Sequence, residues 1–129
     1  IVGVEMTNFS KINKIIPHYT VNTVLDLLFT IPYKVGIEKS SVKYEATWND
    51  KESQIECWIT LKKDQKIKVG SSSFKLEKDE RILLARSIKF NEWTFTKLMS
   101  DVGFRTELLT TANDRGYVLS MVQPTRYSV

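Results

Sequence analysis

The chain has few of the residues that form disulfide cross-links or bind a metal. Among its 129 residues there is one cysteine, Cys57, and one histidine, His18. A single cysteine excludes an internal disulfide and a cysteine-rich zinc site, and the default setting for such a chain is the reducing cytoplasm. At this length we expect one domain that is held together by a hydrophobic core.

Long apolar runs and clustered glycines are also missing. No segment approaches the roughly 20 apolar residues that span a bilayer, so no membrane partner is expected. The first residues, 1–6, lack the basic and long apolar regions of a signal peptide. The five glycines contain no GxGxxG motif, the usual glycine-rich turn that cradles a nucleotide-type cofactor. Because the chain opens on an apolar run without an initiator methionine, we expect a domain fragment or a chain whose first residues are processed or disordered.

The charge of the chain is mildly basic. The net charge is +4 and the pI is about 9.2, which is typical of a solvated surface and not of a nucleic-acid footprint. Four lysines gather at positions 62, 63, 66 and 68, where they suit the protection of an exposed edge strand against aggregation. A non-catalytic α+β module that binds protein or nucleic acid stays open as the alternative function.

The first third of the chain predicts one strand and two helices. Residues 1–6 have the continuous apolar, β-branched character of a buried strand. The first helix is expected over 9–16, with Asn8 as its cap and Pro17 as its end. The second is expected over 21–31, with Thr20 as its cap and with Pro32 and Gly36 as its end signals. The second helix carries one apolar stripe at i, i+3, i+4 and i+7 spacing, formed by Val21, Val24, Leu25 and Leu28.

The remainder predicts antiparallel strands and one further helix. The expected strands are 41–48, 54–61, 66–69, 73–76, 82–85, 105–110 and 117–122. The strand 54–61 alternates, so its core face comprises Ile55, Cys57, Ile59 and Leu61. Asn91 is the predicted N-cap of a helix with an apolar stripe, and Gly103 is placed to end it. We expect a turn at 113–116, a hairpin around 70–72 and a frayed tail at 123–129.

Five segments of the chain share their order and spacing with a known family. They are IVGVEM (1–6), YTVNTVLDLL (19–28), SQIECWITLKKDQKIKV (53–69), RSIKF (86–90) and DVGFRTELLTTANDRGYVLSMV (101–122). Together they resemble the C-terminal part of the histidine-specific SAM-dependent methyltransferases, the family of the histidine methyltransferase of the ergothioneine pathway. The closing order of helix, Gly-Phe, strand, turn and strand is also how class I methyltransferase folds commonly finish.

The resemblance implies an α+β chain that is part of an α/β Rossmann-like methyltransferase. Residues 1–6 and 88–122 would be edge elements of the methyltransferase sheet, residues 7–87 an inserted substrate lobe with helices and antiparallel strands, and 123–129 a tail within one domain, 1–129. S-adenosylmethionine (SAM) would bind mainly outside this chain, which alone would be inactive. The implied partner is a small-molecule methyl acceptor, and the isolated chain would self-associate through its N-terminal strand.

Ser87 is the first candidate for substrate binding. In the family the turn reads Glu-x-Ser-x-Lys-Phe/Tyr, where the Glu holds the substrate's amino group and the Ser bonds the imidazole. Here the Ser is kept as Ser87, but the acid position is Ala85, and a methyl side chain cannot balance an ammonium. Free histidine is therefore not the expected substrate. The alternative is that Ser87 only shapes a turn between strand and helix.

Three other residues complete the expected substrate site. Cys57 matches a substrate-proximal methionine of the family, but a cysteine on the inner face of a strand is also a small core residue, and pairing with His18 would make it a nucleophile. Asn22 points an amide into the pocket or makes a local contact near its helix start. Tyr19 and Trp58 are candidates for aromatic walls of the pocket, or both pack only in the core or at an interface. Trp58 lies on the strand face opposite Cys57, so at most one of these two residues faces a given cavity.

Overall fold

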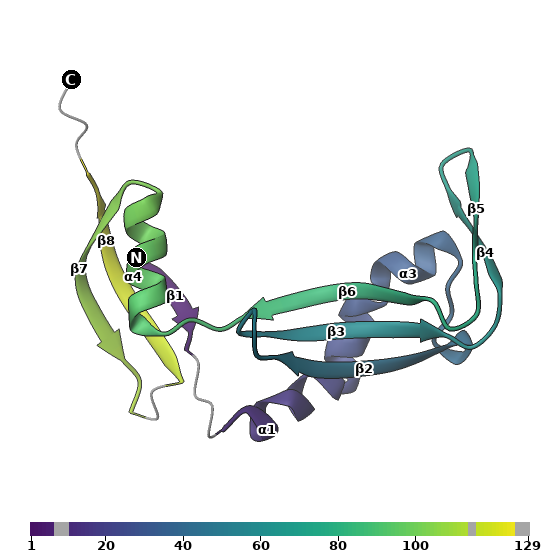
Figure 1. Cartoon of the computed structure of the whole chain (residues 1–129), viewed down its shortest axis with the longest axis horizontal. Helices are drawn as coiled ribbons and strands as arrows, with labels where there is room; N and C mark the ends of the chain where they lie inside the picture. The colour runs from purple at the N-terminus through teal and green to yellow at the C-terminus, as the bar shows by residue number, and fades with distance from the viewer. Residues whose placement is uncertain (7–10, 114–115, 126–129) are drawn as a thin grey trace. The chain divides into compact units, whose positions relative to one another are not determined.

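The computed structural model describes residues 1–6, 11–113 and 116–125 and divides into two compact units. We call Ile1–Ile12 with Ile88–Val129 the terminal unit, and Asn13–Ser87 the central unit. Both combine short helices with antiparallel strands, so the predicted α+β class is confirmed (Figure 1).

In the described part of the terminal unit, a three-stranded sheet is accompanied by helix α4. Its strands are β1 (Val2–Glu5), β7 (Phe104–Thr111) and β8 (Tyr117–Pro124), in the order β1-β8-β7. Both β1 and β7 run antiparallel to β8, and they are therefore parallel to each other. Val118 and Ser120 of β8 are buried, whereas Tyr117, Leu119 and Met121 alternate with them and are exposed. Strands are confirmed in all three predicted segments, but β1 is not the buried strand that the sequence predicts, because its residues alternate between half-buried and exposed.

Helix α4 (Glu92–Asp101) of this unit begins as the sequence predicts. The Oδ1 atom of Asn91 accepts a hydrogen bond from the backbone N–H of Thr94 at 2.8 Å, and Thr94 Oγ1 accepts one from the N–H of Asn91 at 2.9 Å. This reciprocal capping box satisfies two backbone donors that the first turn leaves unpaired. Gly103 follows the helix with φ +84°, which a glycine adopts without strain.

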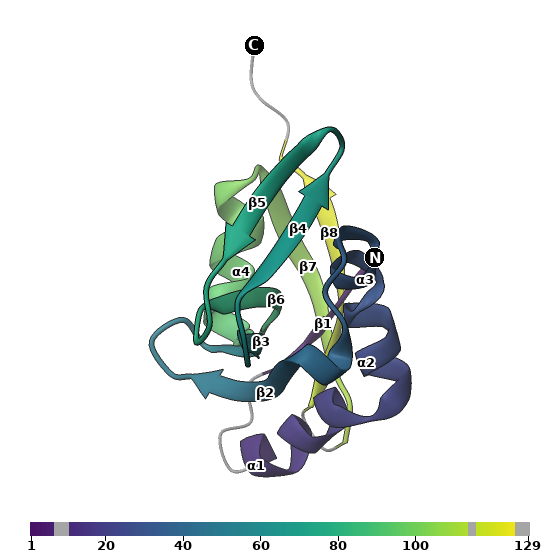
Figure 2. The ribbon, with the colours of Figure 1, turned by 90° about the vertical axis from the view of Figure 1, so that its right-hand side faces the viewer.

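The central unit contains a sheet of order β2-β3-β6 and a separate β4-β5 hairpin. The strands are β2 (Val42–Asn49), β3 (Gln54–Leu61), β4 (Gln65–Val69), β5 (Ser72–Leu76) and β6 (Arg81–Ile88). Before them come α1 (Ile12–Ile15), the 3-10 helix η2 (Ile16–Thr20), α2 (Asn22–Leu28), α3 (Thr30–Val35) and the 3-10 helix η3 (Lys39–Ser41), and Figure 2 shows this helical segment beside β2. Because β2 pairs with β3 over its whole length, the two strands fix each other's register.

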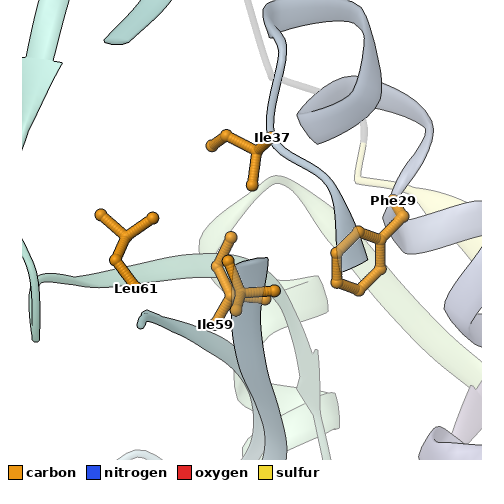
Figure 3. Packing of buried hydrophobic residues seen from close by; sticks show 5 residues of the cluster. Phe29, Ile37, Ile59 and Leu61 are labelled. Carbon is orange, nitrogen blue, oxygen red and sulfur yellow. The ribbon is translucent and has the colours of Figure 1, made fainter. Parts of the chain in front are cut away.

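The core of the central unit lies where the helices meet this sheet. Its buried residues are Phe29, Ile37, Val42, Ile59 and Leu61, and Figure 3 shows the side chains of Phe29 and Ile37 close to the strands. On β3 the residues Ile55, Cys57, Ile59 and Leu61 are all at most 1% exposed, which confirms the predicted core face of that strand.

Of the two helix limits predicted at 17–20, the first is confirmed and the second is wrong. The α-helix α1 ends at Ile15, before Pro17, and the 3-10 helix η2 then continues through the proline, which has the φ angle of a first helical turn and lacks an N–H that is not needed there. Thr20 caps nothing: its hydroxyl donates to the carbonyl of Pro17 at 2.8 Å, and the N-cap of α2 is Val21 without a side-chain bond. The cap and helix start predicted at 8–9 lie outside the described residues.

The second predicted helix is in fact two helices. After α2 ends at Leu28 the chain continues into α3, and Pro32 is buried inside its first turn, where no intrahelical N–H is required. Gly36, with φ +96°, ends α3 as predicted. In the predicted stripe Val21 is exposed and precedes the helix, whereas the other three residues are half-buried.

The third difference concerns β6. The sequence predicts a strand over 82–85 and a turn at 86–90, but the strand continues to Ile88 and contains Ser87. Pairing with β3 supplies a ladder of hydrogen bonds that local propensity does not reveal. Likewise, β8 extends to Pro124, into the predicted tail, while 114–115 of the predicted turn and 126–129 lie outside the described residues.

Candidate substrate site

The structure brings Tyr19 and Ser87 into direct contact. Tyr19 lies on η2 and Ser87 near the end of β6, and the Tyr19 hydroxyl donates a hydrogen bond to Ser87 Oγ at 2.7 Å. Both residues are half-buried, whereas the neighbouring Arg86 is exposed. Two residues that the sequence singled out separately, 68 positions apart, therefore belong to one arrangement within the central unit.

Tyr44 is a member of this arrangement that the sequence reasoning missed. Its hydroxyl donates to the carbonyl oxygen of Tyr19 at 2.8 Å, and burial raises its pKa, with the nearby Cys57 thiol as a second cause. A signal was available: alternation places Tyr44 on the core face of β2 between Val42 and Ala46, and a buried tyrosine hydroxyl needs a partner.

Cys57 has the properties of a packed thiol. It is 1% exposed on the core face of β3, and this burial raises the pKa of the thiol, an effect that the hydrogen bond with Tyr44 partly opposes. A raised pKa disfavours the thiolate, which is the nucleophilic form. His18, the partner considered for a dyad, is exposed on η2. The environment of Cys57 therefore favours packing, beside Tyr44, over nucleophilic catalysis.

Asn22 lies close to Tyr19 along the chain but is exposed. It is the first residue of α2, so its amide can reach either solvent or the start of its own helix, and both interpretations stay open. Ala85 is half-buried in β6, two residues before Ser87. The family resemblance of the sequence predicts a carboxylate at this position, where the structure has a methyl group.

Trp58 belongs to a network on the other face of the sheet. Its Nε1–H donates to Glu56 at 2.9 Å, and the Arg81 guanidinium lies 4.6 Å from the centre of its ring. The same Glu56 carboxylate accepts from Gln54 at 2.6 Å and from Asn49 at 2.8 Å. These bonds, Gln54 first, lower the pKa of Glu56. Glu56 of the Ile-Glu-x-Trp segment thus links β2 and β3 next to the turn that joins them. Trp58 lies on the face of β3 opposite Cys57.

An apolar groove lies elsewhere in the central unit. Its volume is about 290 Å³, and none of Tyr19, Asn22, Cys57 or Ser87 lines it. The lining consists of aliphatic side chains and one proline from the helices and the strands: Leu28, Ile31, Pro32, Val35, Ile37, Ile59, Ile67, Ile82, Leu83 and Leu84. It offers no hydrogen-bonding side chain that would orient a polar ligand.

The described residues do not form the usual cradle for SAM. Gly36 and Gly103 follow helices, Gly70 lies in a hairpin, and Gly3 lies under the Tyr117 ring, where an added Cβ would be 2.2 Å from the phenol oxygen. None of these forms a glycine-rich turn from a strand into a helix. Among the described residues there is also no cluster of three or more His, Cys, Asp or Glu for a metal, and no helix long and apolar enough to cross a membrane.

A comparison with known protein families shows to which family the chain is related. The family described as "Histidine-specific methyltransferase, SAM-dependent" matches residues 19–124. The chain belongs to this family. A search of curated proteins gives no match. The matched span contains Tyr19, Ser87 and the whole β7-β8 hairpin, so the candidate site lies within the part of the chain that carries the family signature. At the level of the family, the activity is SAM-dependent methyl transfer.

Proposed function

We propose that this chain is the C-terminal, substrate-lobe portion of a SAM-dependent methyltransferase that acts on a small molecule other than free histidine. The observation that carries the proposal is the bond between Tyr19 and Ser87. The family pattern gives Ser87 a role in holding the ring of the acceptor, and an aromatic hydroxyl already meets it at 2.7 Å. A serine hydroxyl that bonds the polar group of one aromatic side chain suits an acceptor whose ring carries a similar polar group.

The topology of the terminal unit supports a Rossmann-like context. Its outer strands β1 and β7 are parallel, with β8 antiparallel between them. Mixed sheets of this kind occur where an antiparallel strand joins the edge of an otherwise parallel α/β sheet. In the proposed full-length enzyme that sheet continues beyond β1, and SAM binds mainly in the preceding part, since Gly3, Gly36, Gly70 and Gly103 do not lie in its usual glycine-rich cradle.

Ala85 supports an acceptor other than histidine. The family's acid would neutralise the amino group of the substrate, and an unpaired ammonium close to a half-buried site costs free energy. We expect the acceptor to lack a cationic amine at this position. Tyr19, Asn22, Cys57 and Ser87 remain the proposed substrate-binding residues, with neutral hydroxyl, amide and thiol groups only.

The lysine-rich β4-β5 hairpin favours the second candidate, a binding module without catalysis. Part of its charge is compensated, since Lys75 lies 3.1 Å from Asp64 and 3.8 Å from Glu77. A filter-binding titration with duplex DNA and single-stranded RNA at two salt concentrations separates the candidates, because phosphate contacts weaken as salt rises. Retention that falls with salt supports the binding module, and no retention at low salt excludes nucleic acid.

A labelled-methyl assay tests the main proposal. The full-length gene product that contains this chain is incubated with methyl-labelled SAM and fractions of a metabolite extract, beside Ser87→Ala and the control Ser71→Ala, which alters an exposed residue of the hairpin turn. We expect transfer to at least one fraction and a reduction of about tenfold in Ser87→Ala, the factor that one hydrogen bond of about 1.4 kcal/mol represents. An absence of transfer to every fraction contradicts the proposal.

The cofactor part of the proposal is tested on this chain alone. Because the sequence contains no GxGxxG motif, isothermal titration with SAM is expected to give no micromolar binding, whereas the full-length protein binds. Micromolar or tighter affinity of the 129-residue chain would show that the cofactor site lies here.

Self-association of the isolated chain also follows from the proposal. In β1, Val2 and Val4 pair with β8, while at the other edge the described contact is the bond from the Phe90 N–H to the carbonyl of Glu5 at 3.2 Å. An unpaired strand edge is a template for another chain. We expect light scattering to show dimers that dissociate on dilution, and a monomer at every concentration would contradict this expectation.

A further inference from the structure

Tyr44 connects the hydrophobic core of the central unit to the candidate site. Its ring and the ring of Phe29, a core residue, are tilted by 54° with their centres 6.5 Å apart. Its hydroxyl bonds the carbonyl of Tyr19 at 2.8 Å and lies within hydrogen-bonding reach of the Cys57 thiol. One side chain on β2 therefore contacts the core and two of the four proposed substrate-binding residues.

The bond from Tyr44 fixes the backbone of Tyr19 and leaves its ring to reach Ser87. Tyr19 is the fourth residue of η2, a five-residue 3-10 helix without a side-chain cap. Short 3-10 segments have poor hydrogen-bond geometry and depend on tertiary contacts. With its carbonyl held to β2, Tyr19 extends its phenol towards β6, where it donates to Ser87. The Tyr44 bond therefore helps to set the direction in which the Tyr19 ring leaves η2.

We propose that Tyr44 is the positioning residue of the candidate site, which fixes Tyr19 and, through it, the hydroxyl of Ser87. The inference rests on the proposed function for its catalytic consequence, since Tyr44 acts on the acceptor only through these two residues. The chain of contacts itself, from Phe29 through Tyr44 and Tyr19 to Ser87, lies entirely within the central unit and can be measured in the absence of any acceptor.

Tyrosine-selective NMR tests the positioning. The chain contains five tyrosines; with ¹³C at Cζ, the Tyr19 resonance is identified by its loss in Tyr19→Phe. In Tyr44→Phe we expect this resonance to shift in the same direction as in Ser87→Ala, because both variants release the phenol from its partner. The matched control is Tyr33→Phe, which removes a hydroxyl from another ring beside Phe29, with centres 5.8 Å apart, and leaves the Tyr19 resonance in place.

Three results would overturn the inference. One is a Tyr19 resonance that moves in Ser87→Ala but not in Tyr44→Phe. Another is an equal shift in Tyr33→Phe, which would indicate general loosening around Phe29. If Tyr44→Phe does not fold, hydroxyl proton exchange is measured in the wild-type chain instead. The Tyr44 and Tyr19 hydroxyl protons are both expected to exchange slowly with solvent. Fast exchange of either one is the third contrary result.

A kinetic measurement separates this inference from the proposed function. With the extract fraction that accepts label as the probe, full-length Tyr44→Phe is expected to transfer less methyl at limiting amounts of the fraction and to recover near wild-type rates at saturating amounts. Equal rates at both levels contradict the positioning role. A wild-type enzyme that transfers nothing contradicts the proposed function instead, and the NMR result then still decides whether Tyr44 positions Tyr19.

Discussion

Lys89 forms an ion pair with the carboxylate of Glu5, although the two residues lie 84 positions apart in the sequence. The Lys89 side chain is 1% exposed and that of Glu5 is 44% exposed. Beside them, the N–H of Phe90 donates to the carbonyl of Glu5 at 3.2 Å. Two segments that carry the family resemblance, IVGVEM and RSIKF, are therefore joined in the terminal unit by both backbone and side-chain contacts.

The two partners of this pair are expected to tolerate substitution unequally. In Glu5→Gln the buried ammonium of Lys89 loses the charge of the Glu5 carboxylate, and we expect a loss of about 2 kcal/mol in the free energy of unfolding, less than for a fully buried pair because Glu5 reaches solvent. In Lys89→Met an apolar chain of similar size replaces the charge, and Glu5 stays hydrated, so the loss is smaller. Urea unfolding measures both.

The control for this prediction is an exposed pair on α4. Lys97 and Asp101 are 2.6 Å apart at i, i+4 spacing, and each is more than half exposed. Lys97→Met is expected to change the free energy of unfolding by at most about 0.5 kcal/mol. Equal losses in Glu5→Gln and Lys89→Met would contradict the role of burial in this asymmetry.

A double-mutant cycle tests the bond between Tyr19 and Ser87. Tyr19→Phe and Ser87→Ala each remove one partner of the same hydrogen bond, so each is expected to lower the free energy of unfolding by about 1 kcal/mol. The double variant should lose clearly less than the sum of the two single losses. The control cycle pairs Ser87→Ala with Tyr33→Phe, for which additive losses are expected; additivity in both cycles would mean that the bond contributes nothing.

Cys57 is expected to be unreactive in the folded chain and to make stability depend on alkaline pH. The folded pKa of the thiol is raised by burial, so the stability that it contributes is present below the ordinary thiol pKa of about 8.5 and is lost as pH rises through the folded pKa. Wild type and Cys57→Ala are compared by urea unfolding from neutral to alkaline pH. The wild type should lose more stability over this range, and parallel curves would contradict the raised pKa.

Glu56 is expected to make stability depend on acidic pH, with the opposite sign. Its folded pKa is lowered by the hydrogen bonds from Gln54, Asn49 and Trp58, so its contribution is present above the ordinary glutamate pKa of about 4.3 and is lost as pH falls through the lowered value. Glu56→Gln should therefore lower the melting temperature clearly at pH 7 and much less in strong acid. The control is Glu52→Gln in the adjacent turn, where an exposed side chain should give a small change at both pH values. A Glu56→Gln difference that does not change with pH would show that ionisation of Glu56 does not stabilise the turn.

Local pattern predicted most of the elements because their causes are local. The capping box at Asn91, the glycine after α4 and the alternation of β3 each depend on residues a few positions apart. The prediction that Pro32 ends a helix was wrong because the local rule does not distinguish a helix interior from a first turn. The predicted cap at Thr20 was wrong because its hydroxyl bonds the carbonyl of Pro17 instead. The extension of β6 through Ser87 depends on its pairing with β3, and so on tertiary structure.

The sequence alone determined the class, the family and the residues with suitable chemistry. Periodicity, caps and five ordered segments are properties of neighbouring residues, and they indicate a mixed α+β chain, the methyltransferase relationship and the candidates Tyr19 and Ser87. Only the tertiary structure decided which candidates meet. It joined Tyr19 to Ser87 through η2 and β6, added Tyr44 as their support, and paired Lys89 with Glu5 across 84 positions. A hydrogen bond or ion pair forms where the packing of whole elements brings two groups within about 3 Å, and no local pattern specifies that distance.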